Sequence, residues 1–411
     1  MKITLINHSD TLGGASVVTF RLMEALCRAG VDARLLVGRK NGDSLRVAEA
    51  AGSRRRMIPF LAEHASIFSH NGFSRSRLFR ISIANAGLPL DRHPWVIDAD
   101  VVILNWINQG LLSLDTIKRM ARMKPVIWTM HDMWNLTGGC HHAGSCTRYL
   151  THCADCPLLG FMAGPKDLSS RHFDAKQRLY DSAPLTFVAV SSWLRDRAAE
   201  SALLCCRDVR LIHNPFPIDA LCAEPAFSPS ELGLPADRPV IMLSAARLDD
   251  PVKDLPLAVA GLNELHLSGT DAVALMIGAI KNPDALAGLK IPLIAPGPIY
   301  DKSRLQAFAA HSSVVLSTST FESFGATLLE GQAAGAVPVG FTHDGRADII
   351  TDGISGYAIT DRTPDAVAQA LRRALTDPLP RADLIRAAAR YSSDTVANRY
   401  IALCEQLLGR R

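Results

Sequence analysis

The sequence lacks any run of about 18 apolar residues, the length that a membrane-spanning helix requires. Residues 1–7 also lack the long apolar stretch and the cleavage site of a secretory signal peptide. Charge of one sign is scarce, because 44 Lys and Arg stand against 40 Asp and Glu and leave a formal net charge of +4. This balance does not call for a nucleic-acid partner. We therefore expect a cytoplasmic protein that binds no nucleic acid.

Fixed-period repeats and low-complexity stretches are also missing, and aromatic residues make up only 6% of the chain. The 411 residues are nevertheless 48% hydrophobic, which is enough for two substantial cores. Cysteine occurs nine times, an odd number that suits a reducing compartment better than a framework of disulfides.

Short apolar runs alternate with helical patterns along the chain, which predicts an α/β protein with parallel sheets covered by helices. Strands are expected at residues 2–7, 33–37, 101–105, 126–130, 186–190, 210–213, 240–245, 272–277, 293–296, 314–317 and 337–340. Helices are expected at residues 15–29, 114–123, 191–199, 255–265, 302–310, 364–376 and 393–408. Proline is dense at 215–229, so we expect one domain at 1–218, a second at 219–391, and a last helical segment at 392–411.

The most informative pattern is a pair of glutamates, Glu322 and Glu330, across the expected start of a helix. The N–H groups around Phe324 and Gly325 would form the helix N-terminus, which readily binds phosphate. With a diphosphate on those N–H groups, Glu330 can accept hydrogen bonds from a ribose while Glu322 faces the group on the distal phosphate. This geometry fits a nucleotide-sugar. The alternative is a solvated acidic helix whose first glutamate is favoured by the helix dipole.

Two cations, Arg247 and Lys253, follow the expected strand at 240–245 in one loop. They can clamp the same pyrophosphate, because arginine offers two parallel N–H donors and lysine a point charge. Either residue alone is more often an ordinary surface cation. A glycine pair, Gly13 and Gly14, directly follows the first expected strand and is weak evidence by itself.

Together these segments resemble glycosyltransferase family 4, a large group of retaining enzymes with the GT-B fold. The matching stretches are GGAS at 13–16, HNPFPID at 213–219, LSAAR at 243–247 with KD at 253–254, TFESFGATLLEGQAAG at 320–335 and GRADIITDGISG at 345–356. Two positions depart from the family pattern, since Pro215 replaces the usual glycine of a turn and Asp348 stands where glutamate is commoner.

The resemblance implies two Rossmann-like domains that face each other across a cleft, with residues 392–411 returning to the first domain. It implies a UDP- or GDP-linked sugar donor whose diphosphate contacts Arg247, Lys253, Gly14 and the start of the helix after Glu322. Gly13 would lie on the acceptor side. No cofactor and no divalent metal would be needed for catalysis.

His131 and Asp132 follow the apolar strand at 126–130, at the strand end where open α/β sheets place ligands. We expect His131 to polarise the acceptor hydroxyl or to bind the donor sugar, and Asp132 to fix the tautomer of that histidine or to contact the acceptor. A histidine after a strand is also commonly structural. No carboxylate pair for double displacement is identifiable, so the retaining stereochemistry of the family favours attack on the face that the diphosphate leaves.

Four of the nine cysteines, Cys140, Cys146, Cys153 and Cys156, fall within seventeen residues. The closing Cys-x-x-Cys before a proline is typical of a turn whose thiolates share a tetrahedral structural zinc, with His141, His142 or His152 as alternative ligands. Two disulfides, an iron–sulfur cluster and free thiols are the other interpretations. The segment resembles one found in family members of the colanic-acid type.

Residues 54–80 combine six arginines with eight isoleucine, leucine and phenylalanine side chains. Such a stretch can lie on anionic lipid, and a solvated loop is the alternative. On the first interpretation the enzyme is peripheral on the inner face of the cytoplasmic membrane, and its acceptor is a lipid-diphosphate-linked saccharide.

The sequence thus predicts a retaining glycosyltransferase of cell-surface polysaccharide biosynthesis. Two alternatives remain: a GT-B nucleotide-sugar epimerase, and a non-catalytic protein that binds nucleotide-sugars. The second tends to lose one of Arg247, Lys253, Glu322 or Glu330, and all four are present.

Overall fold

The computed structural model describes residues 1–409 and divides the chain into two compact units. Unit 1 comprises Met1–Pro215 and the C-terminal segment from Ser393, and unit 2 comprises Phe216–Ser392. The first boundary lies three residues before the position expected from proline density. The reason is that Phe216 is fully buried in unit 2, where its ring stacks on Phe324 with 5.7 Å between the ring centroids.

Unit 1 is built on a seven-stranded sheet in the order β3-β2-β1-β4-β5-β6-β7, and all its strand pairs are parallel. The strands are β1 (Lys2–Ser9), β2 (Asp32–Arg39), β3 (Val47–Glu49), β4 (Val101–Leu104), β5 (Val126–Met130), β6 (Leu185–Ala189) and β7 (Val209–Leu211). Every residue of β4 and β5 is buried, as expected for central parallel strands covered by helices on both faces.

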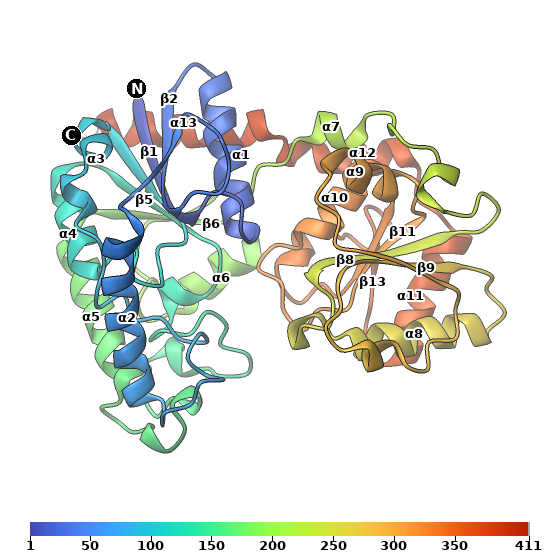
Figure 1. Cartoon of the computed structure of the whole chain (residues 1–411), viewed down its shortest axis with the longest axis horizontal. Coiled ribbons are helices and arrows are strands. Elements are labelled where there is room, and N and C mark those ends of the chain that lie inside the picture. The colour runs from blue at the N-terminus through green and yellow to red at the C-terminus, as the bar shows by residue number, and fades with distance from the viewer. Residues whose placement is uncertain (410–411) are drawn as a thin grey trace. The chain divides into compact units, whose positions relative to one another are not determined.

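The helices of unit 1 pack on both faces of this sheet (Figure 1). They are α1 (Gly14–Arg28), α2 (Ser53–His70), α3 (Pro94–Asp98), α4 (Leu114–Met123), α5 (Leu168–Ser182), α6 (Ser192–Glu200) and α13 (Ser393–Gly409). Ser113 caps α4 and Asp167 caps α5 through hydrogen bonds to backbone N–H groups. The last helix, α13, packs against α1, and its Tyr400 hydroxyl lies 2.9 Å from the Thr129 hydroxyl under the sheet.

Helix α2 was not predicted, and it replaces the solvated loop that we considered for the start of the 54–80 segment. It contains Pro59 in its second turn, where a proline usually disfavours a helix. A tertiary contact accounts for it. The carboxylate of Glu63 is fully buried and accepts hydrogen bonds from the N–H groups of Ile83, Ala84 and Gly110, at 2.8, 2.9 and 2.6 Å. A Cβ on Gly110 would come within 2.4 Å of the helix backbone at residue 60, so only glycine permits this approach.

Unit 2 holds a six-stranded parallel sheet in the order β10-β9-β8-β11-β12-β13. Its strands are β8 (Val240–Arg247), β9 (Val273–Ala279), β10 (Leu293–Gly297), β11 (Val314–Ser317), β12 (Val337–Gly340) and β13 (Tyr357–Ala358). Its helices are α7 (Ile218–Cys222), α8 (Leu255–Leu267), α9 (Lys302–Ala310), α10 (Ala326–Ala334), α11 (Pro364–Thr376) and α12 (Arg381–Ala388). The core on one face joins α8 and α11 to the sheet.

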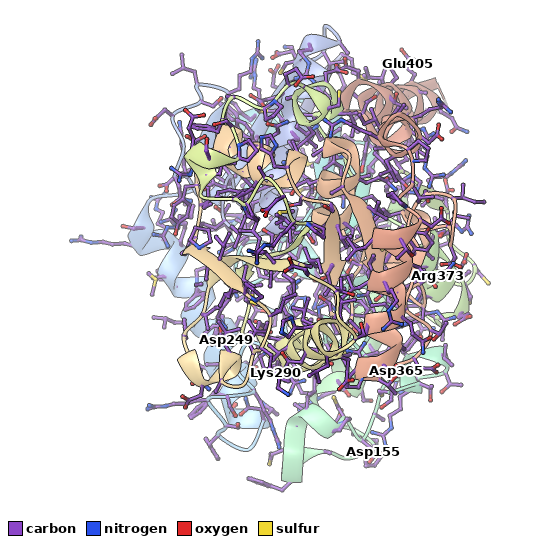
Figure 2. All side chains as sticks on the ribbon, turned by 90° about the vertical axis from the view of Figure 1, so that its right-hand side faces the viewer. Asp155, Asp249, Lys290, Asp365, Arg373 and Glu405 are labelled. Atoms are coloured by element: carbon purple, nitrogen blue, oxygen red, sulfur yellow. The ribbon has the colours of Figure 1, made fainter. Side chains whose placement is uncertain are left out.

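Charged side chains of both signs are spread over the outside of unit 2, where Figure 2 labels Asp249, Lys290, Asp365 and Arg373. Arg373 pairs with Asp352 at 3.0 Å. Among the helices of residues 1–409, none has both the length and the hydropathy of a membrane span.

The strand order reverses direction once in each sheet, between β1 and β4 in unit 1 and between β8 and β11 in unit 2. Ligands of open α/β sheets bind at the carboxyl ends of the strands at such a reversal. Each unit therefore has one predicted ligand position, at the carboxyl ends of β1 and β4 in unit 1 and of β8 and β11 in unit 2.

Candidate functional site

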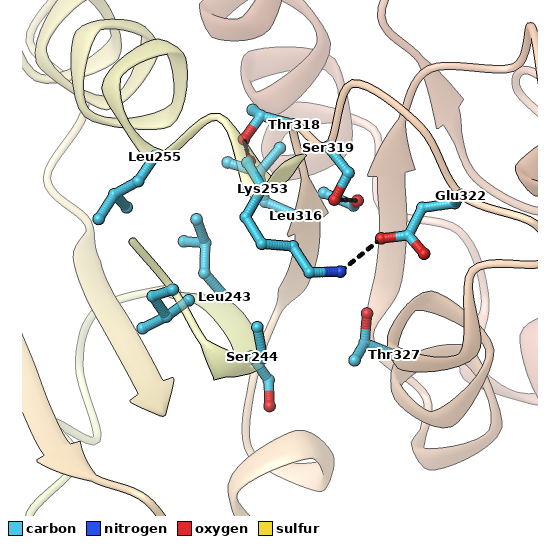
Figure 3. Close-up of a pocket in the computed structure, with 12 residues that line it drawn as sticks. Leu243, Ser244, Lys253, Leu255, Leu316, Thr318, Ser319, Glu322 and Thr327 are labelled. Atoms are coloured by element: carbon cyan, nitrogen blue, oxygen red, sulfur yellow. Dashed lines mark hydrogen bonds and ion pairs between the residues drawn. The ribbon is translucent and has the colours of Figure 1, made fainter. Parts of the chain in front are cut away.

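A small cavity of about 20 Å³ lies in unit 2 at the carboxyl ends of β8 and β11, where the strand order reverses. It is lined by Leu243, Ser244, Ala245, Leu248, Lys253, Leu255, Leu316, Ser317, Thr318, Ser319, Glu322 and Thr327. Figure 3 shows the ammonium group of Lys253 and the carboxylate of Glu322 pointing toward each other in this cavity, with Thr327 of α10 beneath them.

Lys253 and Glu322 form an ion pair whose Nζ and Oε1 atoms lie 2.7 Å apart. The Glu322 side chain is 20% exposed and that of Lys253 is 34% exposed, so water screens the pair only in part. Burial by itself would raise the pKa of the Glu322 carboxyl group. The charge of Lys253 and its hydrogen bond outweigh that effect and hold the pKa below its ordinary value. The carboxylate is therefore ionised at neutral pH.

The backbone around Glu322 is fixed by a buried ion pair between Asp344 and Arg346, which the sequence analysis did not identify. Arg346 is fully buried and binds the Asp344 carboxylate with two N–H donors, at 2.9 and 2.7 Å. The second Asp344 oxygen also accepts the N–H of Glu322 at 2.9 Å. Gly345 donates its N–H to the Glu322 carbonyl at 3.0 Å, and a Cβ there would lie 2.1 Å from the Ser323 carbonyl oxygen.

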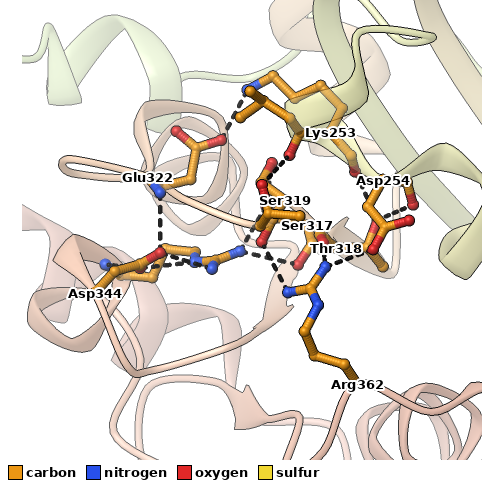
Figure 4. Close-up of polar contacts among 11 residues, drawn as sticks. Lys253, Asp254, Ser317, Thr318, Ser319, Glu322, Asp344 and Arg362 are labelled. Atoms are coloured by element: carbon orange, nitrogen blue, oxygen red, sulfur yellow. Dashed lines mark hydrogen bonds and ion pairs between the residues drawn. The ribbon is translucent and has the colours of Figure 1, made fainter. Parts of the chain in front are cut away.

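The loop that carries Lys253 is held against the strand end by a second set of contacts, drawn in Figure 4. The Thr318 hydroxyl donates to the carbonyl of Lys253 at 3.0 Å. Arg362 pairs with Asp254 at 2.6 Å and also donates to the Thr318 carbonyl at 2.8 Å. Asp254 has a left-handed backbone with φ 48°, which turns the chain into α8. These contacts fix the position of Lys253 relative to Glu322.

The N-terminus of α10 begins beside this ion pair. Gly325 is the N-cap with φ 96°, and its carbonyl accepts from the N–H groups of Leu328 and Leu329. A Cβ on Gly325 would lie 2.9 Å from the Arg346 side chain, so both the backbone angle and the space favour glycine. Phe324 is buried, and Glu330 lies a little over one turn into the helix and is half-buried.

Arg247 does not share a contact with Lys253. It ends β8, and its Nε atom lies 3.1 Å from Oδ1 of Asp249. The other Asp249 oxygen accepts the backbone N–H groups of Lys281 and Asn282, at 3.0 and 2.9 Å. The two cations that we expected on one pyrophosphate are therefore held by two different carboxylates.

In unit 1, His131 follows β5, and its Nε2 atom lies 3.0 Å from Oδ1 of Asn105, at the end of β4. Burial lowers the pKa of His131 to about 4, and the nearby Asp132 charge opposes this shift only in part. The ring is therefore neutral at neutral pH, with Nε2 as donor to Asn105 and Nδ1 as acceptor.

Asp132 does not orient His131 as expected, because its carboxylate is bound to His141. The Oδ2 atom lies 2.8 Å from Nδ1 of His141, and Oδ1 accepts the N–H of Trp134 at 2.8 Å. Burial favours a raised pKa, but the contacts with His141 and with the Trp134 N–H lower the pKa of Asp132 to about 2. The Nε2 atom of His141 lies 3.1 Å from the Ser82 hydroxyl. The sequence did not predict the Asp132–His141 pair, because no local pattern indicates that two residues nine positions apart in a loop are in contact.

Gly13 and Gly14 form the start of α1, after the end of β1. Gly13 has φ 90°, a conformation that favours glycine, while a Cβ on either residue would meet no atom of the chain within 4 Å. The Asn7 side chain at the end of β1 donates to the Ser16 hydroxyl at 3.0 Å and so fixes the loop.

The four clustered cysteines line one small cavity in unit 1, and all nine cysteines of residues 1–409 are free thiols. As the side chains are arranged, no three His, Cys, Asp or Glu residues of this described part form a group that could hold a metal ion. The expected alternative ligands His141 and His152 are engaged elsewhere, with Asp132 and Asp174 respectively, at 2.8 Å each.

Two protein-family models match the chain in agreement with its two units. Residues 12–220 match the model described as Glycosyltransferase Family 4, and residues 231–391 match the model described as Glycosyl transferases group 1. One relative by sequence is WcaC of Escherichia coli (strain K12), named as a colanic acid biosynthesis glycosyl transferase. It is 25% identical over 168 residues, which are 39% of this chain and 40% of WcaC. The alignment thus covers about two fifths of that relative.

Solved structures match over nearly the whole length. A sucrose-phosphate synthase from Thermosynechococcus elongatus has a TM-score of 0.69 at 16% identity, with 100% of both chains covered. Anabaena Alr3699/HepE in complex with UDP-glucose has a TM-score of 0.64 at 15% identity, covering 99% of this chain and 100% of that one. At these identities the likeness establishes the fold, which is GT-B. With one family model over more than half of its length and the second over unit 2, the chain belongs to glycosyltransferase family 4.

Proposed function

We propose that the protein is a retaining glycosyltransferase that moves a sugar from a UDP- or GDP-linked donor to a lipid-diphosphate-linked saccharide, without a catalytic metal. The observation that carries the proposal is the Lys253–Glu322 pair at the strand reversal of unit 2, next to the N-terminus of α10. Family membership supports transfer over epimerisation or binding alone. The likeness to Alr3699/HepE, solved with UDP-glucose, supports a nucleotide-sugar donor.

The donor diphosphate is proposed to bind the first N–H groups of α10 and the ammonium group of Lys253. A helix N-terminus and a lysine both attract phosphate, and Gly325 lets the phosphate approach the backbone. Arg247 would exchange Asp249 for the diphosphate, because its side chain is 38% exposed and a ligand can therefore reach it. Glu330 would accept hydrogen bonds from the ribose hydroxyls.

In the proposed reaction, the bond between the sugar C1 atom and the diphosphate oxygen breaks, and the acceptor hydroxyl oxygen forms a new bond to C1 on the same face. The hydroxyl proton moves to the departing phosphate oxygen. Arg247, Lys253 and the α10 N–H groups stabilise the negative charge that develops on the diphosphate. Glu322 holds the donor sugar in place while C1 carries positive charge.

Unit 1 is proposed to supply the residues that hold the acceptor and the sugar. The neutral ring of His131 presents Nδ1 as an acceptor for a sugar hydroxyl, since Nε2 donates to Asn105. Asp132 acts through His141 rather than through His131. Gly13 and Gly14, at the start of α1, would offer backbone N–H groups to the acceptor and to the diphosphate respectively.

We further propose that α2 rests on the inner face of the cytoplasmic membrane, where lipid-linked saccharides are found. Its exposed side chains include the apolar Met57, Ile58 and Leu61, which are 47, 70 and 56% exposed, beside the exposed Arg54 and Arg55. Apolar side chains next to cations suit an anionic lipid surface. The likeness to WcaC supports a role in cell-surface polysaccharide biosynthesis.

A thermal-shift screen with UDP-, GDP- and ADP-linked sugars tests the donor assignment. A donor at about 100 times its Kd stabilises by about 2.7 kcal/mol, or about 5–10 °C in the Tm of a domain of this size. Lys253→Ala should lose the shift, and Lys302→Ala, an exposed lysine of the same unit, should keep it. If none of the three sugar nucleotides raises the Tm of the wild type, the proposal fails.

Two further measurements test stereochemistry and membrane contact. NMR of the product should show the same anomeric configuration as the donor, and inversion would refute the retaining mechanism. Sedimentation with phosphatidylglycerol vesicles should fall about tenfold in Ile58→Glu/Leu61→Glu. The control Ile354→Glu, at an exposed apolar residue of unit 2, should sediment as the wild type does. Equal sedimentation of all three proteins would exclude α2 as the contact.

A further inference from the structure

The four clustered cysteines come together around one cavity of about 30 Å³ in unit 1. The cavity is lined by Ile81, Gly138, Gly139, Cys140, Cys146, Arg148, Cys153, Ala154, Cys156 and Ser169. The four thiols thus all come from residues 140–156. The other residues that line the cavity supply no carboxylate or imidazole. A cavity whose potential ligands are four sulfur atoms has the chemistry of a tetrahedral thiolate site.

Burial raises the pKa of the Cys140 thiol to about 11 and that of the Cys153 thiol to about 12, and backbone N–H groups oppose the rise at Cys153 and Cys156. The N–H of Gly138 donates to the sulfur of Cys153 at 3.1 Å, and the N–H of Leu158 interacts with the thiol of Cys156. Hydrogen bonds from backbone N–H groups stabilise negative charge on sulfur. A Cβ on Gly138 would lie 2.6 Å from the Cys153 side chain, so this glycine permits the approach.

The buried side chain of Lys176 lies next to the thiols. Lys176 is fully buried, donates to the carbonyls of Trp134 and Thr137, and lies 3.4 Å from the centre of the Trp134 ring. Cys140 and Cys153 are within electrostatic range of it. Among the contacts that the structure describes for Lys176, no carboxylate forms an ion pair with it within 4 Å. Burial lowers the pKa of Lys176 well below its ordinary value, and negative charge at Cys140 and Cys153 would oppose that shift.

We propose that Cys140, Cys146, Cys153 and Cys156 bind one zinc ion in a closed structural site. Binding requires the thiols to turn inward about their Cα–Cβ bonds, and each thiol releases its proton to solvent as its sulfur–zinc bond forms. The site braces the segment from Asp132 to His141, because Cys140 is adjacent to His141 and the Thr137 hydroxyl donates to the Cys140 carbonyl at 2.6 Å. The assignment does not depend on the proposed transferase activity.

The first test is elemental analysis of the full-length protein, produced with zinc in the medium and purified in reductant without chelator. We expect about one zinc per chain in the wild type and less than about 0.2 in Cys153→Ser/Cys156→Ser. The matched control is Cys205→Ser/Cys206→Ser, a pair of exposed cysteines in the same unit, which should keep the metal. Zinc-free wild type that also fails to bind added Zn²⁺ would overturn the proposal, as would iron with sulfide or a disulfide within the cluster.

A second measurement covers the case in which the double variant does not fold. Wild type in which Co²⁺ replaces the bound metal should show the intense absorption of tetrahedral cobalt thiolate, and its absence would overturn the four-sulfur ligand set. Removal of zinc with a chelator should increase hydrogen exchange at residues 132–159 at least about tenfold while leaving residues 314–334 of unit 2 unchanged. Unchanged exchange at 132–159 would refute the bracing role.

Discussion

Removing the ammonium group from the Lys253–Glu322 pair should reveal how much the pair stabilises unit 2. In Lys253→Met the long side chain remains, but the Glu322 carboxylate loses its partner 2.7 Å away. Unit charges about 4 Å apart attract by about 4 kcal/mol at an effective dielectric constant of 20. Lys253 is 34% exposed, so screening and the cost of desolvation reduce this. We expect a coupling free energy of about 2 kcal/mol.

A double-mutant cycle with Glu322→Gln measures that coupling. Lys253→Met alone should lower the Tm of unit 2 by about 4–8 °C, given about 2–4 °C per kcal/mol for a domain of this size. The double variant should recover most of the loss, because its uncharged glutamine leaves no unpaired, partly buried carboxylate. Calorimetry of the four proteins, with Lys302→Met as the control at an exposed lysine, gives each value.

The pH dependence of the same cycle gives a second check. Because the pKa of Glu322 in the folded protein lies below its ordinary value of 4.5, the stability from the pair is fully present above pH 4.5. It is lost as the pH falls through the lowered pKa, where the carboxylate gains a proton. The difference between wild type and Lys253→Met should therefore be constant from pH 6 to 8 and shrink below 4.5.

The functional part of the cycle separates stability from donor binding. The double variant should regain its Tm but not the thermal shift produced by a sugar nucleotide, since both proposed donor contacts are gone. A coupling free energy below about 0.5 kcal/mol, or one that does not change with pH, would refute the electrostatic reasoning. Restored donor binding in the double variant would instead remove the pair from the site.

Three further predictions concern single residues. Gly345→Ala should destabilise unit 2 by at least about 2 kcal/mol in calorimetry, because its Cβ would lie 2.1 Å from the Ser323 carbonyl oxygen; an unchanged Tm would refute the close approach. Glu63→Gln should lower the free energy of unfolding of unit 1 by about 2 kcal/mol, because an amide offers a single acceptor oxygen to the three N–H groups that the carboxylate binds. Equal urea midpoints for the variant and the wild type would contradict this. Because the pKa of His131 is about 4 in the folded protein, stability is full above the unfolded value of 6.5 and falls by about 3 kcal/mol by pH 4. His131→Gln should abolish that part of the acid sensitivity in pH-dependent unfolding.

Much of the fold could be predicted from local pattern. The strands at 126–130, 314–317 and 337–340 and the helices at 114–123, 302–310 and 364–376 were predicted with the bounds that the structure has. In these segments burial and periodicity agree, because central parallel strands are hydrophobic throughout and each helix has a recognisable start. Helix α2 and the long helix α5 were missed. Helix α2 contains a proline, which disfavours a helix in the sequence pattern, and helix α5 has mostly polar residues between its buried positions.

The sequence by itself determined which residue types the candidate site offers, since Lys253, Glu322 and Glu330 could be proposed from their places relative to strands and a helix start. Only the tertiary structure decided which of them meet. Lys253 and Glu322 are 69 residues apart and pair because β8 and β11 are neighbours at the strand reversal, whereas Arg247 pairs with Asp249. Asp344 and Arg346 look like ordinary surface charges in the sequence, and burial between loops makes them the support of Glu322. Which charged side chains form ion pairs depends on the order of the strands in the sheet and on which side chains are buried away from water. Neither is a local property of the chain.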